Sequence, residues 1–266
     1  MRYRKLFIGA VITGTYGIMR FAAKKYAEDE HINDDNPYLN SGIISSGERG
    51  NTKGKRKLYG NAVKPALDHI LSFCGLIVLC PLYGVIALAI KIDDPGPIFF
   101  TQKRIGKDKT YFMCHKFRTM KMSTPHDIPT HLLSYPEAYI THVGRKLRKK
   151  SLDELPQIWD IFRGKMSIIG PRPALWNQDD LVAEREKYRV NDVMPGLTGL
   201  AQISGRDELE IPEKARLDGE YVNHIGFLKD VKYFFGTIVS VLRHDGVVEG
   251  GTGRLHANSA KLSYEK

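Results

Sequence analysis

An uncharged apolar run from Ile70 to Ile90, 21 residues long, constrains this chain most. A helix needs about 20 predominantly apolar residues to cross a bilayer, so the run is long enough to do so. Pro81 lies near its middle, where a proline removes a backbone hydrogen bond and kinks a helix. Basic residues flank the run on both sides: Lys53, Lys55, Arg56, Lys57 and Lys64 before it, and Lys91, Lys103, Arg104 and Lys107 after it. Positive charge favours the cytoplasmic side, so both ends favour that side.

Two membrane arrangements fit this run. A helix over residues 63–92 that breaks at Pro81, enters one leaflet and returns keeps both basic ends in the cytoplasm, and the charges favour this re-entrant form. An ordinary spanning helix with an incidental proline satisfies only one end and stays as the alternative. The length disfavours a buried helix in a soluble core.

The segments outside this run differ in composition. Residues 6–19 carry no charge and are flanked by basic residues, but 14 residues fall short of a bilayer-spanning helix. No A-x-A cleavage site follows, so we interpret residues 1–25 as an N-terminal membrane anchor. Residues 26–62 are acidic, then rich in Asn, Gly and Ser, then basic, which predicts a flexible linker. Residues 248–266 are predicted to be a loose tail.

Residues 93–247 have the mixed polar and apolar pattern of a helix-rich α/β domain. Two strands are predicted at 98–106 and 111–120, around the turn "KDK", and helices at 153–163 and 175–190. The segment 231–243 is apolar with basic ends. It suits either a helix lying at a membrane surface or a core helix of the domain, and both interpretations stay open.

The charge balance predicts an anionic partner. Lys plus Arg number 40 against 30 for Asp plus Glu, an excess of 10 that suits nucleic acid, lipid headgroups or a phosphorylated substrate. Three cysteines, Cys74, Cys80 and Cys114, form neither a disulfide framework nor a paired metal-ligand spacing. They favour a reducing cytosolic environment.

The stretch "SLDELPQIWD" places Asp153 and Glu154 next to each other just before a proline. One interpretation is structural: Ser151 and Glu154 have the capping-box spacing, and Pro156 suits the first turn of a helix. The other interpretation is chemical, because several basic residues that suit phosphate binding lie between residues 102 and 206. These are Lys103, Arg104, Lys116, Arg118, Arg145, Arg148, Arg172 and Arg206.

Arg172 is the sharpest of these candidates because Pro171 and Pro173 flank it and restrict the loop that presents its guanidinium. A carboxylate pair among phosphate-binding cations suggests Mg²⁺, which is commonly held by one or two carboxylates together with substrate phosphates. An aspartate can also attack phosphorus. These residues predict a membrane-attached enzyme that acts on a phosphate-containing substrate.

Five motifs carry a resemblance to a known family. "KPALDHILS", "DDPGPIFFTQKRIG", "FMCHKFRTM", "VGRKLRKKSLDELPQIWDIFRGKMSIIGPRP" and "PGLTGLAQISGR" lie in order between about residues 62 and 245. Together they resemble the bacterial sugar transferases, the monotopic polyprenyl-phosphate phosphoglycosyl transferases. The long block from SLDELPQ to GPRP is the most specific of them.

The resemblance implies roles for individual residues. Asp153 matches the family's nucleophile, Glu154 its Mg²⁺ ligand, and Arg148 and Arg172 its basic phosphate-binding residues. Cys80-Pro81 stands where the family has the Ser-Pro pair that breaks the membrane helix. Two departures concern other positions: the usual K-R-x-x-D opening reads "KPALD", and "VNHIGFLKD" follows Tyr221 where a tryptophan-bearing stretch is usual.

The implied activity is transfer of a sugar phosphate from a UDP-sugar to polyprenyl (undecaprenyl) phosphate, with release of UMP. It would start exopolysaccharide, O-antigen or related glycan assembly at the cytoplasmic face of a bacterial inner membrane. The implied cofactor is Mg²⁺, no nucleic-acid partner is expected, and a homodimer is left open. Two alternatives remain: a membrane-bound Mg²⁺ phosphodiesterase, and a non-enzymatic scaffold that binds anionic lipid or nucleic acid.

Overall fold

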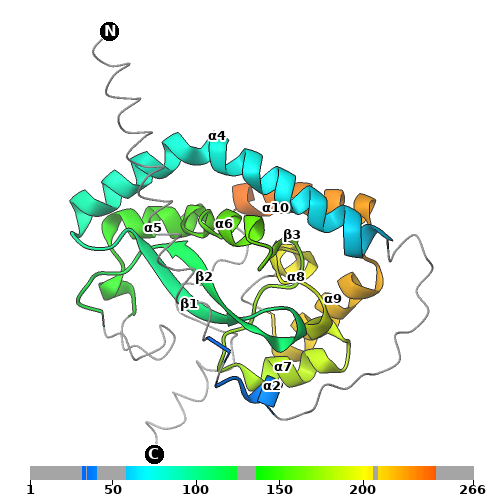
Figure 1. Ribbon diagram of the computed structural model, residues 1–266. Helices are drawn as coiled ribbons and strands as arrows, with labels where there is room; N and C mark the ends of the chain where they lie inside the picture. Colours follow the sequence, from blue (N-terminus) through cyan, green and yellow to red (C-terminus); the bar gives the residue numbers. More distant parts are fainter. Residues whose placement is uncertain (1–31, 34, 41–57, 125–135, 206–208, 244–266) are drawn as a thin grey trace, which may run out of the picture.

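The computed structural model describes residues 32–33, 35–40, 58–124, 136–205 and 209–243 (Figure 1). The predicted N-terminal anchor, most of the predicted linker, Arg206 and the predicted tail lie outside these residues. The described chain is a mixed, helix-rich α/β structure, as predicted.

Two strands form an antiparallel hairpin. Strand β1 (Phe99–Ile105) pairs with β2 (Tyr111–Phe117), which confirms the predicted hairpin. The turn between them is a 3-10 turn, Lys107–Lys109, in which Asp108 adopts a left-handed conformation with φ 54°. Consecutive side chains of β2 point to opposite sides of the hairpin, so side chains on only one side can reach a given neighbouring element.

Helices surround this hairpin, and a second pair of short strands, β3 (Ser167–Ile169) and β4 (Gly196–Thr198), is parallel. The helices are α2 (Pro37–Asn40), α4 (Lys64–Asp93), α5 (His142–Lys149), α6 (Gln157–Phe162), α7 (Asp179–Glu186), α8 (Leu200–Ser204), α9 (Ile211–Asn223) and α10 (Phe227–Arg243).

The predicted helix at 153–163 is divided. A 3-10 turn, Leu152–Glu154, comes first, and α6 begins only at Gln157. Ser151 has φ 53°, a left-handed conformation, and its side chain caps no backbone N–H, so the capping-box interpretation is wrong. The predicted helix at 175–190 is shorter too, because Arg189 with φ 57° also leaves the helical region.

Helix α4 runs unbroken through Pro81 for 30 residues, whereas a break was predicted at Cys80-Pro81. The helix arches over α5, α6 and α10 (Figure 1). One face packs on the domain, where Tyr83, Ile86 and Ile90 join Phe117 and Leu147 in a buried cluster. A five-residue π-helical segment, Tyr59–Val63, precedes α4. Among the described residues, the segment from Tyr59 to Asp93 is the one helix long and apolar enough to cross a membrane.

Both ends of α4 are attached to the same domain. At its start, Lys64 Nζ lies 2.7 Å from Asp230 Oδ2 on α10. At its end, Asp93 Oδ2 accepts a hydrogen bond of 2.7 Å from the backbone N–H of Val143. One turn inside its start, the buried Asp68 accepts a 2.7 Å hydrogen bond from the hydroxyl of Ser167. The helix therefore lies along the domain rather than projecting from it.

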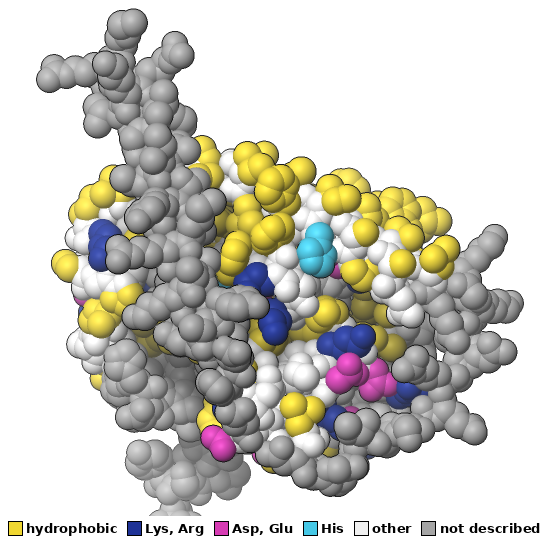
Figure 2. Space-filling model, viewed as in Figure 1, with side chains coloured by type: hydrophobic (Ala, Val, Ile, Leu, Met, Phe, Trp, Pro, Cys, Tyr) yellow, Lys and Arg dark blue, Asp and Glu magenta, His cyan; other side chains and the backbone are white. Residues whose placement is uncertain are grey.

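The opposite face of α4 is apolar and exposed, and α10 adds to it (Figure 2). On α10, Tyr233 is buried in the core while Phe235 is 61% exposed, so one side of this helix belongs to the core and the other side is apolar and exposed. We call the combined surface the apolar face. Its members are Ile70, Leu71, Phe73, Ile77, Val78, Leu82, Val85, Leu88 and Ile92 on α4, and Phe227, Leu228, Val231, Phe234, Phe235, Ile238 and Val239 on α10.

A described part of the predicted linker packs on the domain. Asn36 is fully buried, and its side-chain amide donates a 2.9 Å hydrogen bond to the carbonyl of Lys109 in the hairpin turn. The hydroxyl of Tyr38 in α2 donates to Asp179 at the start of α7. These contacts fix residues 36–38 against two elements of the domain.

Candidate active site

Asp153 and Glu154 lie in the 3-10 turn between α5 and α6, under α4. Their side chains are largely buried, with 9% and 7% of the residue surface exposed. The left-handed Ser151 turns the chain sharply just before them. The hydroxyl of Tyr83 on α4 donates a 2.7 Å hydrogen bond to the carbonyl of Leu155, which fixes the turn against the long helix.

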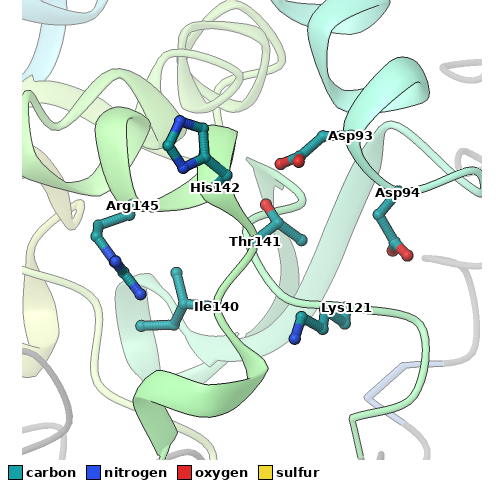
Figure 3. Close-up of a pocket in the computed structure, with 7 residues that line it drawn as sticks. All are labelled: Asp93, Asp94, Lys121, Ile140, Thr141, His142 and Arg145. Carbon is teal, nitrogen blue, oxygen red and sulfur yellow. The ribbon is translucent and has the colours of Figure 1, made fainter.

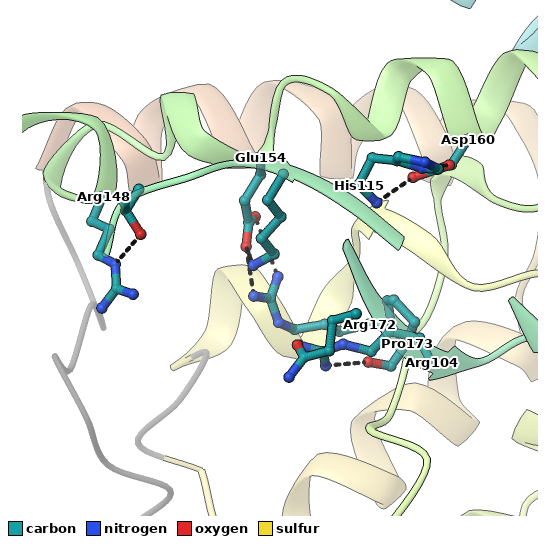
Figure 4. Close-up of polar contacts among 10 residues, drawn as sticks. Arg104, His115, Arg148, Glu154, Asp160, Arg172 and Pro173 are labelled. Carbon is teal, nitrogen blue, oxygen red and sulfur yellow. Dashed lines mark hydrogen bonds and ion pairs between the residues drawn. The ribbon is translucent and has the colours of Figure 1, made fainter. Parts of the chain in front are cut away.

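Glu154 is held by two cations (Figure 4). Its Oε1 accepts hydrogen bonds from Lys116 Nζ at 2.8 Å and from Arg172 Nη2 at 2.6 Å, and its Oε2 accepts from Arg172 Nη1 at 3.3 Å. The guanidinium thus grips both carboxylate oxygens, a paired geometry that only arginine offers.

Asp153 differs from its neighbour, because its carboxylate makes no hydrogen bond or ion pair with any residue the structure describes. Burial raises the pKa of Asp153 above its ordinary value, and the adjacent Glu154 raises it further. Lys116, Arg148 and Arg172 act in the opposite direction. The result is a carboxylate with free oxygens, little hydration and three cations close by.

The loop that carries Arg172 is stiff, as its prolines predict. It extends the parallel pairing of β3 and β4: the N–H of Gly170 donates to the carbonyl of Thr198 at 2.7 Å, and the N–H of Gly196 donates to that of Pro171 at 2.8 Å. A Cβ atom at Gly170 would lie 2.7 Å from the carbonyl oxygen of Met194, so the close approach requires glycine. Arg172 therefore projects from a fixed backbone.

The sequence-based choice of site residues missed the importance of Lys116 and of a buried pair beside it. His115 donates its backbone N–H to Asp160 Oδ2 at 2.9 Å, and His115 Nδ1 lies 2.6 Å from Asp160 Oδ1 (Figure 4). Burial raises the pKa of Asp160, and the hydrogen bond from His115 opposes this. The pair joins β2 to α6 and so aims the next residue, Lys116, at Glu154. Because consecutive side chains of a strand point to opposite sides, the direction of Lys116 along the predicted strand was the available signal.

The other predicted residues lie in different places. Arg148 donates its Nε–H to Thr119 Oγ1 at 2.9 Å. Arg118 is buried and paired with Asp94, and Arg145 lines a cavity beside that pair rather than the dyad. Cys80 is a buried free thiol on the domain side of α4.

The two carboxylates suit Mg²⁺. No group of three His, Cys, Asp or Glu side chains that could hold a metal ion occurs among the described residues. Mg²⁺ does not need such a cage, because it commonly takes one or two carboxylates and completes its shell with water and substrate phosphates. The carboxylate oxygens of Asp153 are free to bind such an ion, and those of Glu154 are held by the side chains of Lys116 and Arg172.

A buried carboxylate with free oxygens and three cations close by suits a site that binds phosphate groups. The cations offset the negative charge that a phosphate would bring to the carboxylates. The model of the family described as "Bacterial sugar transferase" matches residues 59–244. The chain belongs to this family.

Curated relatives agree with this family. The chain is 36% identical to "Exopolysaccharide production protein ExoY" of Sinorhizobium fredii over 196 residues, which cover 68% of this chain and 86% of that protein. It is 38% identical over 189 residues to "UDP-glucose:undecaprenyl-phosphate glucose-1-phosphate transferase" of Escherichia coli, covering 66% of this chain and 39% of that protein. It is 34% identical over 199 residues to "Undecaprenyl-phosphate galactose phosphotransferase" of Salmonella typhimurium, covering 69% and 41% respectively.

Proposed function

We propose that this chain transfers a sugar 1-phosphate from a UDP-sugar to polyprenyl phosphate and releases UMP. The observation that carries the proposal is the buried Asp153 with free carboxylate oxygens beside the Lys116–Glu154–Arg172 cluster. The names of the Escherichia coli and Salmonella relatives describe the transfer of sugar phosphates to undecaprenyl phosphate, and the name ExoY places a relative in exopolysaccharide production.

The reaction proceeds in two displacements. A carboxylate oxygen of Asp153 attacks the phosphorus that bears the sugar, and the bond from that phosphorus to the bridging oxygen breaks, so that UMP leaves with the bond electrons. A phosphate oxygen of the lipid then attacks the same phosphorus and expels the aspartate. The product is polyprenyl-diphosphate-sugar, and Asp153 returns to its starting state. Two easier steps replace one direct transfer between two anions.

The cations around Glu154 prepare the site for this substrate. In the free protein Arg172 and Lys116 neutralise Glu154. An incoming diphosphate offers them a second set of oxygens, because Arg pairs as readily with phosphate as with carboxylate. As they turn to the diphosphate, Glu154 regains free oxygens and, together with Asp153, would hold Mg²⁺. When bound, the ion would offset the negative charge of the diphosphate.

We assign the chain to the cytoplasmic face of a membrane, with α4 and α10 inserted from one side. Helix α4 is about 45 Å long at 1.5 Å per residue. Its two ends bind the same domain through Lys64 and Asp93, so a straight span would pull one of these contacts across the bilayer. The apolar face suits burial among lipid chains.

Cysteine labelling tests this topology. Single cysteines at the exposed Leu58 and Lys107, in a variant lacking the three native cysteines, are expected to react with a membrane-impermeant reagent only after the cytoplasmic side is opened. Labelling of either position from the opposite side of sealed cells would contradict one-sided insertion. Replacing Pro81 with Leu is expected to favour a spanning helix, and the labelled side of one position would then change.

A turnover assay tests the proposed function. The purified full chain is incubated with undecaprenyl phosphate, Mg²⁺ and each UDP-sugar of a panel, and UMP release is measured. Lipid-dependent UMP release with one or more UDP-sugars is expected. Release of free sugar phosphate without the lipid would identify a phosphodiesterase. Binding of anionic vesicles with no turnover of any UDP-sugar would identify a scaffold.

A further inference from the structure

A cavity of about 330 Å³ lies at the C-terminal end of α4, beside the N-terminus of α5 (Figure 3). Its volume is within the range of small-molecule sites. It is lined by Asp93, Asp94, Lys121, Ile140, Thr141, His142 and Arg145. Six of these seven side chains are polar, so the cavity does not suit an apolar ligand.

The two aspartates are held so that each keeps one oxygen available. Asp93 Oδ2 accepts the N–H of Val143 at 2.7 Å, and Asp94 Oδ2 accepts the N–H of Met122 at 3.0 Å and pairs with Arg118. Neither Oδ1 atom has a hydrogen-bond partner among the described residues. The carboxylates are therefore oriented acceptors.

Donors line the same cavity. In Figure 3, His142 and Arg145 lie across the cavity from the two aspartates. Neither ring nor guanidinium is hydrogen-bonded within the part of the chain that the structure describes. The cavity thus offers fixed acceptors on one side and available donors on the other.

This cavity lies at the start of α5, whereas the dyad follows the end of that helix, and Thr119 connects the two. The backbone N–H of Thr141 donates to the carbonyl of Thr119 at 3.0 Å, and the hydroxyl of Thr119 accepts the Nε–H of Arg148 at 2.9 Å. Arg145 and Arg148 are three residues apart on α5, which places them on one helix face. Arg148 in turn acts on the charge of Asp153. Thr119 and Arg148 thus form a chain of contacts that leads from the cavity toward Asp153.

We propose that this cavity binds the hydroxyl groups of the donor's sugar. The inference rests on the proposed function and adds a location for the sugar to it. A free anion would face the carboxylates of Asp93 and Asp94, and a metal cation would face Arg118, Arg145 and Lys121. A neutral ring with several hydroxyl groups avoids both kinds of charge repulsion, because each hydroxyl can donate to a carboxylate and accept from a cation.

The test separates binding of the sugar from binding of the nucleotide. Asp93→Asn keeps a carbonyl acceptor for Val143 but removes the charge that holds the hydroxyls. The variant is made in the full chain carrying Asp153→Asn, which prevents turnover. Its affinities for UDP and for the UDP-sugar that the wild type uses are measured by calorimetry. Asp192→Asn, on an exposed carboxylate paired with Arg189, is the matched control.

Asp93→Asn is expected to weaken binding of the UDP-sugar by about tenfold while the affinity for UDP stays within about twofold, since a hydrogen bond to a charged group is worth about that factor. Arg145→Gln should act in the same direction. Removing a negative charge would by itself strengthen UDP binding, so charge alone does not explain this result.

Equal loss of UDP and UDP-sugar affinity, or no loss in either variant, would overturn the sugar assignment while wild-type turnover upholds the proposed function. A wild-type chain that turns over no UDP-sugar would overturn both.

Discussion

Two pairs of adjacent acidic residues lie on either side of α5, and they differ in their partners. Asp93 and Asp94 accept hydrogen bonds from backbone N–H groups, which cannot move without unfolding the local structure. Glu154 accepts from the side chains of Lys116 and Arg172, and Asp153 is without a partner among the described residues. Both pairs read alike in sequence, as two neighbouring carboxylates.

The type of hydrogen-bond partner therefore determines the role that a carboxylate can have. A carboxylate bonded to backbone is fixed and serves structure or orientation. A carboxylate bonded to flexible cations can exchange them for a substrate, and a buried one without a partner is destabilised in its ionised form and therefore reactive.

The largest effect is expected for Asp153→Asn. UMP release and covalent labelling by a donor with a radiolabelled sugar should both fall by at least about 10³-fold, because the amide is no nucleophile. Asp192→Asn is the control and should retain labelling. A labelled Asp153→Asn protein, or initial-rate plots that intersect instead of running parallel, would show that Asp153 is not the nucleophile.

Arg172→Lys is expected to lower kcat/KM by about 10²-fold. Lysine keeps the charge but cannot grip two oxygens at once, whether of Glu154 or of a diphosphate. Steady-state kinetics of UMP release measure this. Arg216→Lys, at an exposed arginine that also pairs with a glutamate, controls for the substitution itself. Kinetics within twofold of the wild type would mean that Arg172 does not contact the reacting diphosphate.

Glu154→Gln is expected to lower turnover by about tenfold and to raise the Mg²⁺ concentration needed for half-maximal activity. The neutral amide is a weaker ligand for a hard cation than a carboxylate. A Mg²⁺ titration of activity distinguishes this from a structural effect, because added Mg²⁺ should restore part of the turnover. An unchanged Mg²⁺ dependence would argue against Glu154 as a metal ligand.

The smallest effect concerns pH and stability. The raised pKa of Asp153 means that the unfolded chain releases this proton at a lower pH than the folded chain does. As the pH rises above the ordinary pKa of an aspartate, ionisation of the buried Asp153 therefore lowers the free energy of unfolding. This loss of stability persists at neutral pH. Asp153→Asn should raise Tm more at pH 7 than near pH 4, by about 2–4 °C per kcal/mol relieved.

Asp94→Asn supplies the contrast to that stability effect. It weakens the pairing of the buried Arg118 and should lower Tm at pH 7. Thermal unfolding of both variants at the two pH values measures the difference. A fall in Tm for Asp153→Asn at pH 7 would mean that attraction to the nearby cations stabilises the carboxylate of Asp153 more than its burial destabilises it.

Much of the fold could be predicted from local patterns. The hairpin at 98–120 followed from two strand-like segments around the turn "KDK", and the long helix from the uncharged run. The predicted helices at 153–163 and 175–190 are shorter in the structure, because residues 152–154 form a 3-10 turn before α6 and α7 ends at Glu186, before the left-handed Arg189. The left-handed residues beside these ends, Ser151 and Arg189, are neither glycine nor asparagine, so no residue type marked them.

The site was predictable in part. Asp153, Glu154 and Arg172 come together as expected, because Arg172 donates to Glu154 and the pairing of β3 with β4 holds the loop that carries Arg172. Arg118, predicted as a phosphate-site residue, pairs with Asp94 at the end of α4. Lys116 was one of eight basic candidates, and its contact with Glu154 follows from the folded hairpin.

The sequence by itself determined the hairpin, the apolar helix, the basic charge balance and the acidic pair, because each depends on residues close together along the chain. The tertiary structure decided which carboxylates are buried, which cations surround them, and that both ends of α4 rest on one domain. Those properties depend on contacts such as His115 with Asp160 and Lys64 with Asp230, between residues 45 and 166 positions apart. Burial and long-range pairing set the energy of a charge, and no local pattern encodes them.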